Sequence, residues 1–181
     1  PAYSLGWVVT EESFFPRNQY LTFMKIRGSY GVVGNDKIGG DRFLYRPTSY
    51  SYGGKYHWGE DGSTYQTYKG AYEGKLGNPD LTWEKAHKMN IGADIKFLND
   101  RLSFSFDYFQ ERRSNILANR GTVPTIVGAN FPAYNLGKMK NGGLEFELAY
   151  NDKIGDFNYY AKVNYTYAHN EIEYMDAVSY T

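Results

Sequence analysis

Apolar and polar residues alternate along several stretches of the chain, and this pattern limits the possible folds most strongly. The clearest run covers residues 89–97, where every second residue from Met89 to Phe97 is apolar and the residues between are polar or glycine. A period of two is typical of a strand whose two faces meet different surroundings. Helical periodicity is hard to find anywhere in the chain. The sequence therefore predicts an all-β, antiparallel fold.

The alternating segments are predicted to form six strands in three hairpins. They cover residues 3–7, 24–30, 89–97, 102–108, 144–150 and 159–167. Short turns rich in Asn and Asp are predicted at 98–101 and 151–156, because these residues tolerate the left-handed backbone of tight turns. Long connections cover 34–79 and about 118–138, and a loop of such length is usually functional. Long and short connections thus alternate.

Composition excludes several function classes. Lys and Arg number 20, as do Asp and Glu, so the net charge is zero and the basic excess of a nucleic-acid-binding protein is missing. The absence of cysteine excludes disulfides, thiolate metal sites and cysteine nucleophiles. A hydrophobic content of 41% is too high for a disordered chain. No apolar run reaches the roughly 20 residues of a membrane-spanning helix.

Two folds satisfy the alternation: a soluble β-sandwich buries its apolar face against a second sheet, whereas a membrane β-barrel turns that face to lipid. In 159–167 the apolar face is aromatic at both ends and aliphatic between, as in interfacial aromatic girdles. The predicted apolar faces carry no charge within these spans. The opposite faces are polar, with Lys25, Arg27, Asn90, Asp94, Asp107, Glu145, Glu147, Lys162 and Asn164. These features favour a barrel, and a secreted carbohydrate-binding sandwich is the alternative.

Several stretches together resemble the β-barrel region of SusC/RagA-type TonB-dependent outer-membrane transporters. They are residues 24–35, 78–84, 90–109, 142–148 and 170–172, and their order and spacing match along nearly the whole chain. The resemblance implies a transmembrane barrel of about 22 strands with an N-terminal plug, in a Bacteroidetes-like outer membrane. It also implies TonB-dependent import of glycans or peptides beneath a SusD-like surface lipoprotein. The short turns then face the periplasm and the long loops the exterior.

The resemblance also sets the expected domain. Residues 1–181 are expected to be a partial barrel domain of about six strands, without the plug, the TonB-contacting segment or the C-terminal strand. Six strands do not close a barrel, and unpaired edges are not tolerated in lipid. We expect no cofactor and no catalytic residue, because such a protein acts by binding and conformational release. A passive porin or an adhesin barrel is a further alternative.

Aromatic and amide side chains in the long loops are the predicted substrate contacts. Flat rings pack against sugar rings or peptide side chains, and Asn supplies both a donor and an acceptor. The candidates are Tyr50, Tyr52, Tyr56, Trp58, Asn130 and Tyr134. The competing interpretation is that these loops pack among themselves.

Other candidate chemistry is weak. Glu145 and Glu147 point the same way on one strand, but polarity of a water-filled lumen explains them more simply than acid–base catalysis. The three histidines have no ligand-like spacing, so a zinc site is not expected. Glu60, Asp61 and Ser63 offer oxygen ligands for calcium but fall short of an EF-hand loop.

Overall fold

The computed structural model describes residues 1–16, 18–36, 43–47, 50–59, 66–72, 74–120 and 131–175. The chain divides into two compact units. The first consists of Pro1–Asn35, Lys85–Ser114 and Lys138–Glu173, and the second of Asp36–Glu84, Asn115–Gly137 and Tyr174–Thr181. Among the described residues, no helix is long and apolar enough to cross a membrane.

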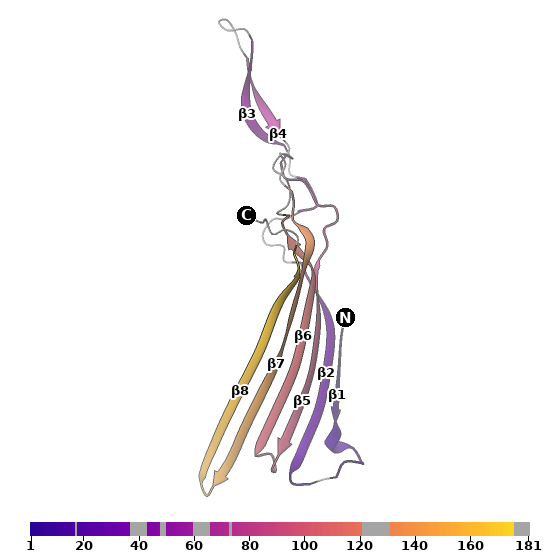
Figure 1. Ribbon diagram of the computed structural model, residues 1–181, viewed down its shortest axis with the longest axis vertical. Helices are drawn as coiled ribbons and strands as arrows, with labels where there is room; N and C mark the ends of the chain where they lie inside the picture. Colours follow the sequence, from indigo (N-terminus) through magenta and orange to yellow (C-terminus); the bar gives the residue numbers. More distant parts are fainter. Residues whose placement is uncertain are drawn as a thin grey trace. The chain divides into compact units, whose positions relative to one another are not determined.

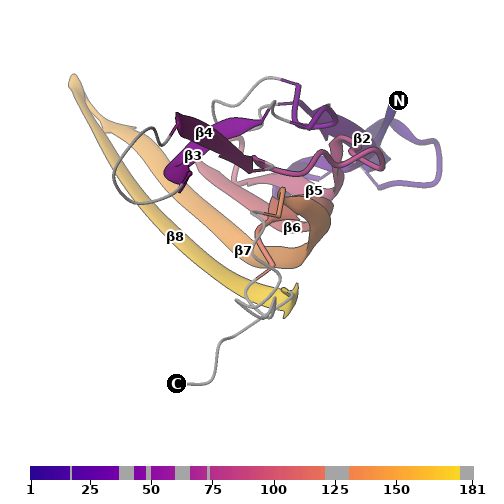
Figure 2. The same ribbon diagram turned by 90° about the horizontal axis from the view of Figure 1, so that it is seen from above.

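A six-stranded sheet in the order β1-β2-β5-β6-β7-β8 dominates the first unit (Figure 1). Its strands are β1 (Ala2–Val8), β2 (Leu21–Asn35), β5 (Glu84–Phe97), β6 (Leu102–Ala118), β7 (Tyr134–Ile154) and β8 (Phe157–Tyr174), with a short 3-10 helix, η1 (Val9–Glu11), after β1. β1 pairs antiparallel with β2, and β5 with β6. Seen from above, the sheet is bowed (Figure 2). Each of the six predicted strands is present in this sheet.

The strands extend beyond their predicted limits, and one predicted turn is wrong. β7 continues to Ile154, so the turn before β8 consists of Gly155 and Asp156 rather than residues 151–156. The Asn151 N–H donates a 2.8 Å hydrogen bond to the Arg101 carbonyl, which keeps this part of the chain alongside its neighbour. Gly155 has φ +60°, a conformation that glycine adopts without steric cost.

The turn between β5 and β6 lies where it was predicted. Leu98, Asn99 and Asp100 all have positive φ, at 56°, 54° and 65°. Asn and Asp tolerate this region, whereas Leu98 is held there by its N–H, which donates to the Tyr20 carbonyl at 3.0 Å. Both short turns lie at one end of the sheet, and the long connections leave from the other end (Figure 1).

The sheet has an apolar face and a polar face, as the alternation predicts. From Ile91 to Phe97 of β5, residues directly opposite each other on β5 and β6 are either both apolar or aromatic, or both small or polar. The first kind of pair is Ile91–Tyr108, Ala93–Phe106 and Ile95–Phe104, and the second is Gly92–Asp107, Asp94–Ser105 and Lys96–Ser103. Matched faces fix the register, because a slip of one residue would exchange them.

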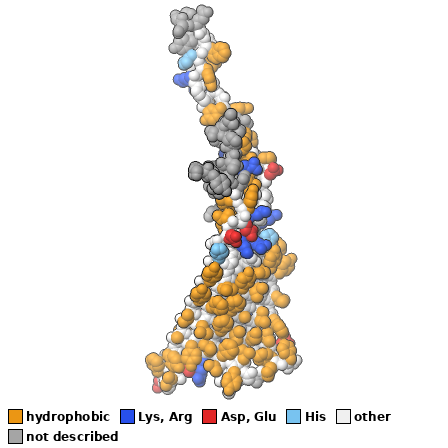
Figure 3. Space-filling view, in the orientation of Figure 1, with side chains coloured by type: hydrophobic (Ala, Val, Ile, Leu, Met, Phe, Trp, Pro, Cys, Tyr) orange, Lys and Arg blue, Asp and Glu red, His pale blue; other side chains and the backbone are white. Residues whose placement is uncertain are grey.

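Aromatic rings form a continuous contact across the apolar face. The Phe146 ring lies 5.0 Å from Phe106, 6.2 Å from Phe104 and 6.2 Å from Tyr165, between ring centroids. Hydrophobic side chains cover this face in Figure 3, and Val163 is 66% exposed. In the described part of the chain, no second sheet covers these side chains, and an uncovered apolar face is typical of a membrane barrel. The face is built to contact lipid.

The first long connection contains two strands that the sequence analysis did not predict. β3 (Ser51–Trp58) and β4 (Gln66–Tyr72) pair antiparallel in a separate two-stranded sheet of the second unit. The register shifts between Tyr52 and Lys55, where Gly53 and Gly54 lie. This β-bulge interrupts the period of two. The sequence of β3 therefore does not alternate along its length, and alternation did not predict the strand.

A charge placed on the apolar face tests its contact with lipid. We expect Val163→Arg to lower the free energy of unfolding by about 2–4 kcal/mol, the cost of a cation near the bilayer midplane. The matched control is Asn164→Arg, because Asn164 is the next residue and lines a polar-face cavity with Glu145 and Glu147. The measurement is urea unfolding of the intact protein in lipid vesicles. Equal losses for the two variants would contradict lipid contact.

Candidate functional site

Four aromatic rings share one face of the β3–β4 hairpin. Tyr56 lies opposite Tyr68, and Trp58 lies opposite Gln66, so both predicted candidates join the face that carries Tyr68 and Tyr72. We call Tyr56, Trp58, Tyr68 and Tyr72 the aromatic platform. Their exposed fractions are 61%, 71%, 54% and 54%, respectively. The rings therefore present open surfaces rather than a packed core.

Gly70 allows one platform ring to lie across the hairpin. A Cβ atom at Gly70 would overlap the ring of Tyr56, so glycine leaves the space that this ring occupies. An aromatic side chain that covers a glycine on the neighbouring strand stabilises such a pair. The platform is thus formed by strand register and by one missing side chain.

The bulge separates the other hairpin candidates from the platform. Tyr52 lies opposite Ala71 and therefore on the face of Lys69, whose ammonium nitrogen is 5.6 Å from the centre of the Tyr52 ring. Tyr50 precedes β3 and is 74% exposed. The sequence grouped four hairpin aromatics, and the structure brings only Tyr56 and Trp58 of them onto one face.

The candidates in the second long connection have different surroundings. Tyr134 is the first residue of β7, and the guanidinium carbon of Arg120 lies 4.7 Å from the centre of its ring. This geometry is a cation–π contact. Asn130 lies outside the described residues, as do the calcium candidates Glu60, Asp61 and Ser63.

Asn78 is a buried amide that sequence reasoning did not select as a site residue. It is 1% exposed, and its backbone N–H donates to the Leu44 carbonyl at 2.9 Å. Its side-chain amide donates to the Ala133 carbonyl at 3.0 Å and accepts from the Asp80 N–H at 3.1 Å. Asn78 therefore connects the two long connections, and the turn-forming Asn-Pro pair was the only sequence signal for it.

Asn135 makes a second amide link in the same unit. Its Nδ2 donates to the carbonyls of Thr82 at 2.8 Å and Asn115 at 2.7 Å, and its Oδ1 accepts from the Thr82 N–H at 3.0 Å. One side chain thus joins the segment before β5, the C-terminal part of β6 and the start of β7. These amides hold the bases of the long connections by directed hydrogen bonds.

The polar face of the sheet carries an ion-pair network centred on Arg27. Two guanidinium nitrogens donate to the Asp107 carboxylate at 2.7 and 2.6 Å, and Nε donates to Asp94 at 3.1 Å. Ser105 donates to the other Asp94 oxygen at 2.7 Å. The paired, bidentate geometry is strong and directional. The network joins β2, β5 and β6 across the polar face.

Gly92 makes room for this guanidinium group. A Cβ atom at Gly92 would lie 2.7 Å from an Asp107 carboxylate oxygen and 2.8 Å from the Arg27 Cζ. On the neighbouring strands, Lys162 and Glu147 form a 2.6 Å ion pair on the same face. Polar residues of this face also line a cavity of about 200 Å³. These side chains require water or polar partners, as the inside of a barrel provides.

The described residues contain no group of three or more His, Asp or Glu side chains arranged to hold a metal ion. The side chains that the structure does bring together are aromatic rings, amides and ion pairs. Such groups bind and position ligands.

An uncovered apolar face, a polar face with ion pairs, and alternating short turns and long connections define one wall of a membrane β-barrel. The chain belongs to the TonB-dependent receptor-like β-barrel family, whose family model it matches over residues 1–181. Receptors of this family lie in the bacterial outer membrane, and this chain is part of such a protein.

Named relatives refine this similarity. The chain is 35% identical over 177 residues to the TonB-dependent receptor SusC of Bacteroides thetaiotaomicron, covering 95% of this chain and 17% of that protein. It is 29% identical to the TonB-dependent receptor P39 of Formosa agariphila, covering 95% of this chain and 15% of that protein. The chain therefore spans less than a fifth of the length of these relatives.

Solved structures agree with the sequence relatives. The RagAB peptide importer in its open-open state superimposes with a TM-score of 0.74 and 28% identity, over 96% of this chain and 18% of the matched chain. Its closed-closed state gives a TM-score of 0.72 and 27% identity, over 97% and 18%. The resemblance to SusC/RagA-type transporters is confirmed.

Substituting Gly92 tests the polar-face network. We expect Gly92→Ala to displace the Arg27 guanidinium and to cost about 1–3 kcal/mol, the value of hydrogen bonds to charged groups. The matched control is Gly28→Ala, because a Cβ atom there meets only the Asn90 carbonyl, at 3.9 Å. Urea unfolding of the intact protein measures both effects. If the two variants lose the same stability, the absence of a side chain at Gly92 is not what makes room for Arg27.

Proposed function

We propose that the protein takes part in active import of oligomeric nutrients across the outer membrane, with energy supplied through TonB and with a SusD-like surface lipoprotein as its partner. The observation that carries this proposal is the match to SusC along 95% of the chain, together with the fold shared with the RagAB peptide importer. The cargo is a glycan or a peptide oligomer.

The geometry supports binding and release rather than covalent chemistry. The aromatic platform offers flat, exposed rings on a hairpin within a long connection. Rings of this kind stack on sugar rings or on apolar peptide side chains and lose little entropy on binding. We therefore propose that the platform contacts cargo on its way into the barrel and that the protein is not an enzyme.

Both cargo classes suit the platform, and they differ in what else they need. A glycan needs flat faces and hydroxyl partners, which Tyr56, Tyr68 and Tyr72 combine in one side chain each. A peptide also presents a charged terminus or charged side chains. Lys69 could pair with a carboxylate of such a peptide, and it lies on the hairpin face opposite the platform. Direct comparison of the two cargo classes decides between them.

Energy coupling separates this proposal from a passive porin. We expect cells that produce the intact protein to accumulate a fluorescent oligosaccharide pool or a pool of short peptides only when TonB is present. The measurement is cell-associated fluorescence in strains with and without TonB, and also without the neighbouring surface lipoprotein. Uptake that continues undiminished without TonB would exclude active import.

The platform rings provide the second test. We expect Tyr56→Ala combined with Trp58→Ala to weaken uptake of the accepted pool roughly 10- to 100-fold at low concentration, since each stacked ring contributes about 0.5–1.5 kcal/mol beyond buried area. The control pair, Phe14→Ala with Tyr20→Ala, removes two exposed aromatics from the segment that joins β1 to β2. Trp58→Ala alone covers the case in which the double variant disturbs the hairpin. Unchanged uptake in both platform variants would remove the proposed role.

A further inference from the structure

The apolar face ends in a sharp change of chemistry toward the long connections. Moving along β5 and β6 from the pair Ile91–Tyr108, the next pairs on this face are Met89–Gln110, His87–Arg112 and Lys85–Ser114. Within three pairs, the face changes from hydrophobic to cationic. Figure 3 shows charged and histidine side chains gathered directly beyond the hydrophobic area. In a membrane protein, this is the level at which lipid headgroups replace acyl chains.

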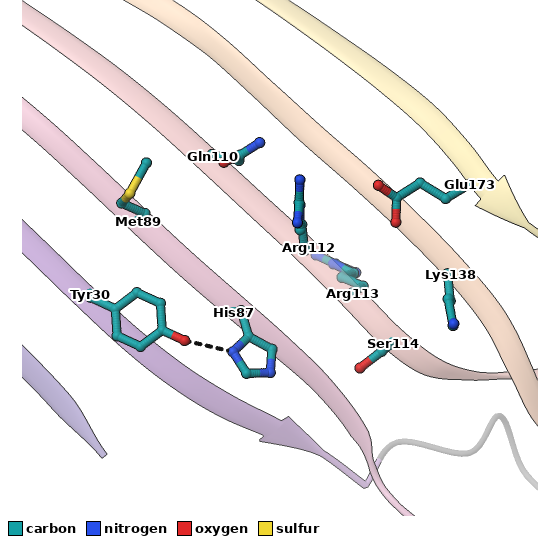
Figure 4. A pocket seen from close by; sticks show the side chains of 9 residues that line it. All are labelled: Tyr30, His87, Met89, Gln110, Arg112, Arg113, Ser114, Lys138 and Glu173. Atoms are coloured by element: carbon teal, nitrogen blue, oxygen red, sulfur yellow. Dashed lines mark hydrogen bonds between the residues drawn. The ribbon is translucent and has the colours of Figure 1, made fainter.

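Two adjoining cavities lie at this transition. The first, of about 520 Å³, is lined by Tyr30, His87, Arg112 and Lys138 from four neighbouring strands, and by Glu173 (Figure 4). The second, of about 320 Å³, is lined by Tyr108, Lys140, Gly142, Leu144 and Tyr167. Gln110 lines both cavities. The two cavities therefore border each other. The first has the cations Arg112, Arg113 and Lys138 in its wall. The second joins the apolar side chains of Tyr108, Leu144 and Tyr167 to the polar ones of Lys140, His169 and Glu171.

A glycine opens the second cavity. Gly142 lies on β7 two residues from Leu144, and a Cβ atom there would meet only one atom within 4 Å, the Phe109 carbonyl oxygen. The missing side chain leaves a shallow groove, whose lining includes Tyr108, Leu144 and Tyr167. A groove with aromatic walls on a lipid-facing surface suits one acyl chain.

The charges around these cavities are unequal. Lys85, Arg112, Lys138 and Lys140 lie on this surface, against the carboxylates of Glu171 and Glu173. We call the four cations and His87 the cationic collar. Within the described part of the chain, no ion pair holds Arg112, Lys138 or Lys140, whereas the nearby Arg113 is bound by Glu111. The collar carries excess positive charge in a chain whose net charge is zero.

The histidine is oriented by a tyrosine. The Tyr30 hydroxyl and His87 Nδ1 are 2.8 Å apart, which fixes the imidazole between β2 and β6 (Figure 4). With Nδ1 engaged, Nε2 is the nitrogen available to a ligand in the cavity. Arg112 lies directly opposite His87 on the neighbouring strand. A planar fork of N–H donors beside an imidazole matches the oxygens of a phosphate group.

We propose that the cationic collar and the Gly142 groove together bind a phosphorylated lipid of the outer leaflet. The phosphate lies against His87, Arg112 and Lys138, and one acyl chain lies in the groove. The continuity of a cationic cavity with an apolar groove favours a lipid over a free anion, which needs only the cations. Attraction between basic side chains and anionic headgroups provides the affinity, and salt weakens it.

The test uses the intact protein in neutral detergent, with the phosphorylated glycolipid of the outer membrane, its dephosphorylated form and inorganic phosphate as probes. Native mass spectrometry and titration measure binding. We expect Arg112→Gln combined with Lys138→Gln to bind the phosphorylated lipid roughly 10- to 30-fold more weakly, from two lost cations near the headgroup. The dephosphorylated lipid should bind wild type as weakly as the phosphorylated lipid binds the variant.

Controls separate the lipid site from general charge effects. Lys25→Gln combined with Lys88→Gln removes the same amount of charge from the polar face of the sheet. This variant should bind the lipid as wild type does. Gly142→Leu fills the groove and should weaken lipid binding while leaving any binding of inorganic phosphate unchanged. Arg112→Lys keeps the charge but loses the planar fork, so its affinity should lie between those of wild type and the double variant. A heat-modifiable gel shift confirms that each variant folds.

Two results would overturn the proposal. Equal lipid binding by wild type and by the Arg112→Gln, Lys138→Gln variant would remove the collar from the site. The site would instead bind a free anion if that variant loses binding of inorganic phosphate while Gly142→Leu leaves lipid binding unchanged. The measurement requires no transport, so its failure is independent of the proposed import function.

Discussion

Hydrogen bonding of the backbone in lipid is the constraint on which the rest of this structure depends. A peptide group that faces hydrocarbon has no water to bind, so every N–H and C=O must pair with a neighbouring strand. The six strands satisfy this within the sheet, but β1 and β8 each have a neighbour on one side only. The family to which the chain belongs meets the requirement by closing a barrel. Side-chain alternation follows, because one face of such a wall meets lipid and the other meets water.

The two faces are stabilised in different ways. On the apolar face, contacts such as those around Phe146 fill space between neighbouring strands, and lipid completes the surface. On the polar face, Arg27 is held by two carboxylates from two other strands, and Gly92 leaves the space for it. A guanidinium group with two carboxylates needs a polar environment to offset desolvation. The network therefore belongs to a wet interior and would be costly on the other face.

Local pattern was enough to predict the sheet but not the site. The residues from Met89 to Phe97 alternate cleanly, and from Ile91 onward their partners on β6 are of the same kind. The predicted turn over 151–156 was wrong, because Asn151 forms a hydrogen bond with Arg101, which lies far away in the sequence, immediately before β6. The β3–β4 hairpin was not predicted, because a bulge interrupts the alternation of β3. The same bulge places Tyr52 and Tyr56 on opposite faces of the hairpin. The role of Asn135 was not predicted, because its hydrogen-bond partners Thr82 and Asn115 are far from it in the sequence and come close only in the folded chain.

The two ends of the apolar face differ in how far their charged side chains are paired. Near the short turns, Asp152 accepts hydrogen bonds from Tyr150, Tyr159 and Arg101, so its charge is matched locally. Toward the long connections, the cations of the collar outnumber the nearby carboxylates. A sheet with a locally paired carboxylate at one end and a cationic collar at the other is not symmetric with respect to the membrane. An outer leaflet rich in phosphate would favour one orientation of this wall, with the collar toward the side from which the long connections emerge.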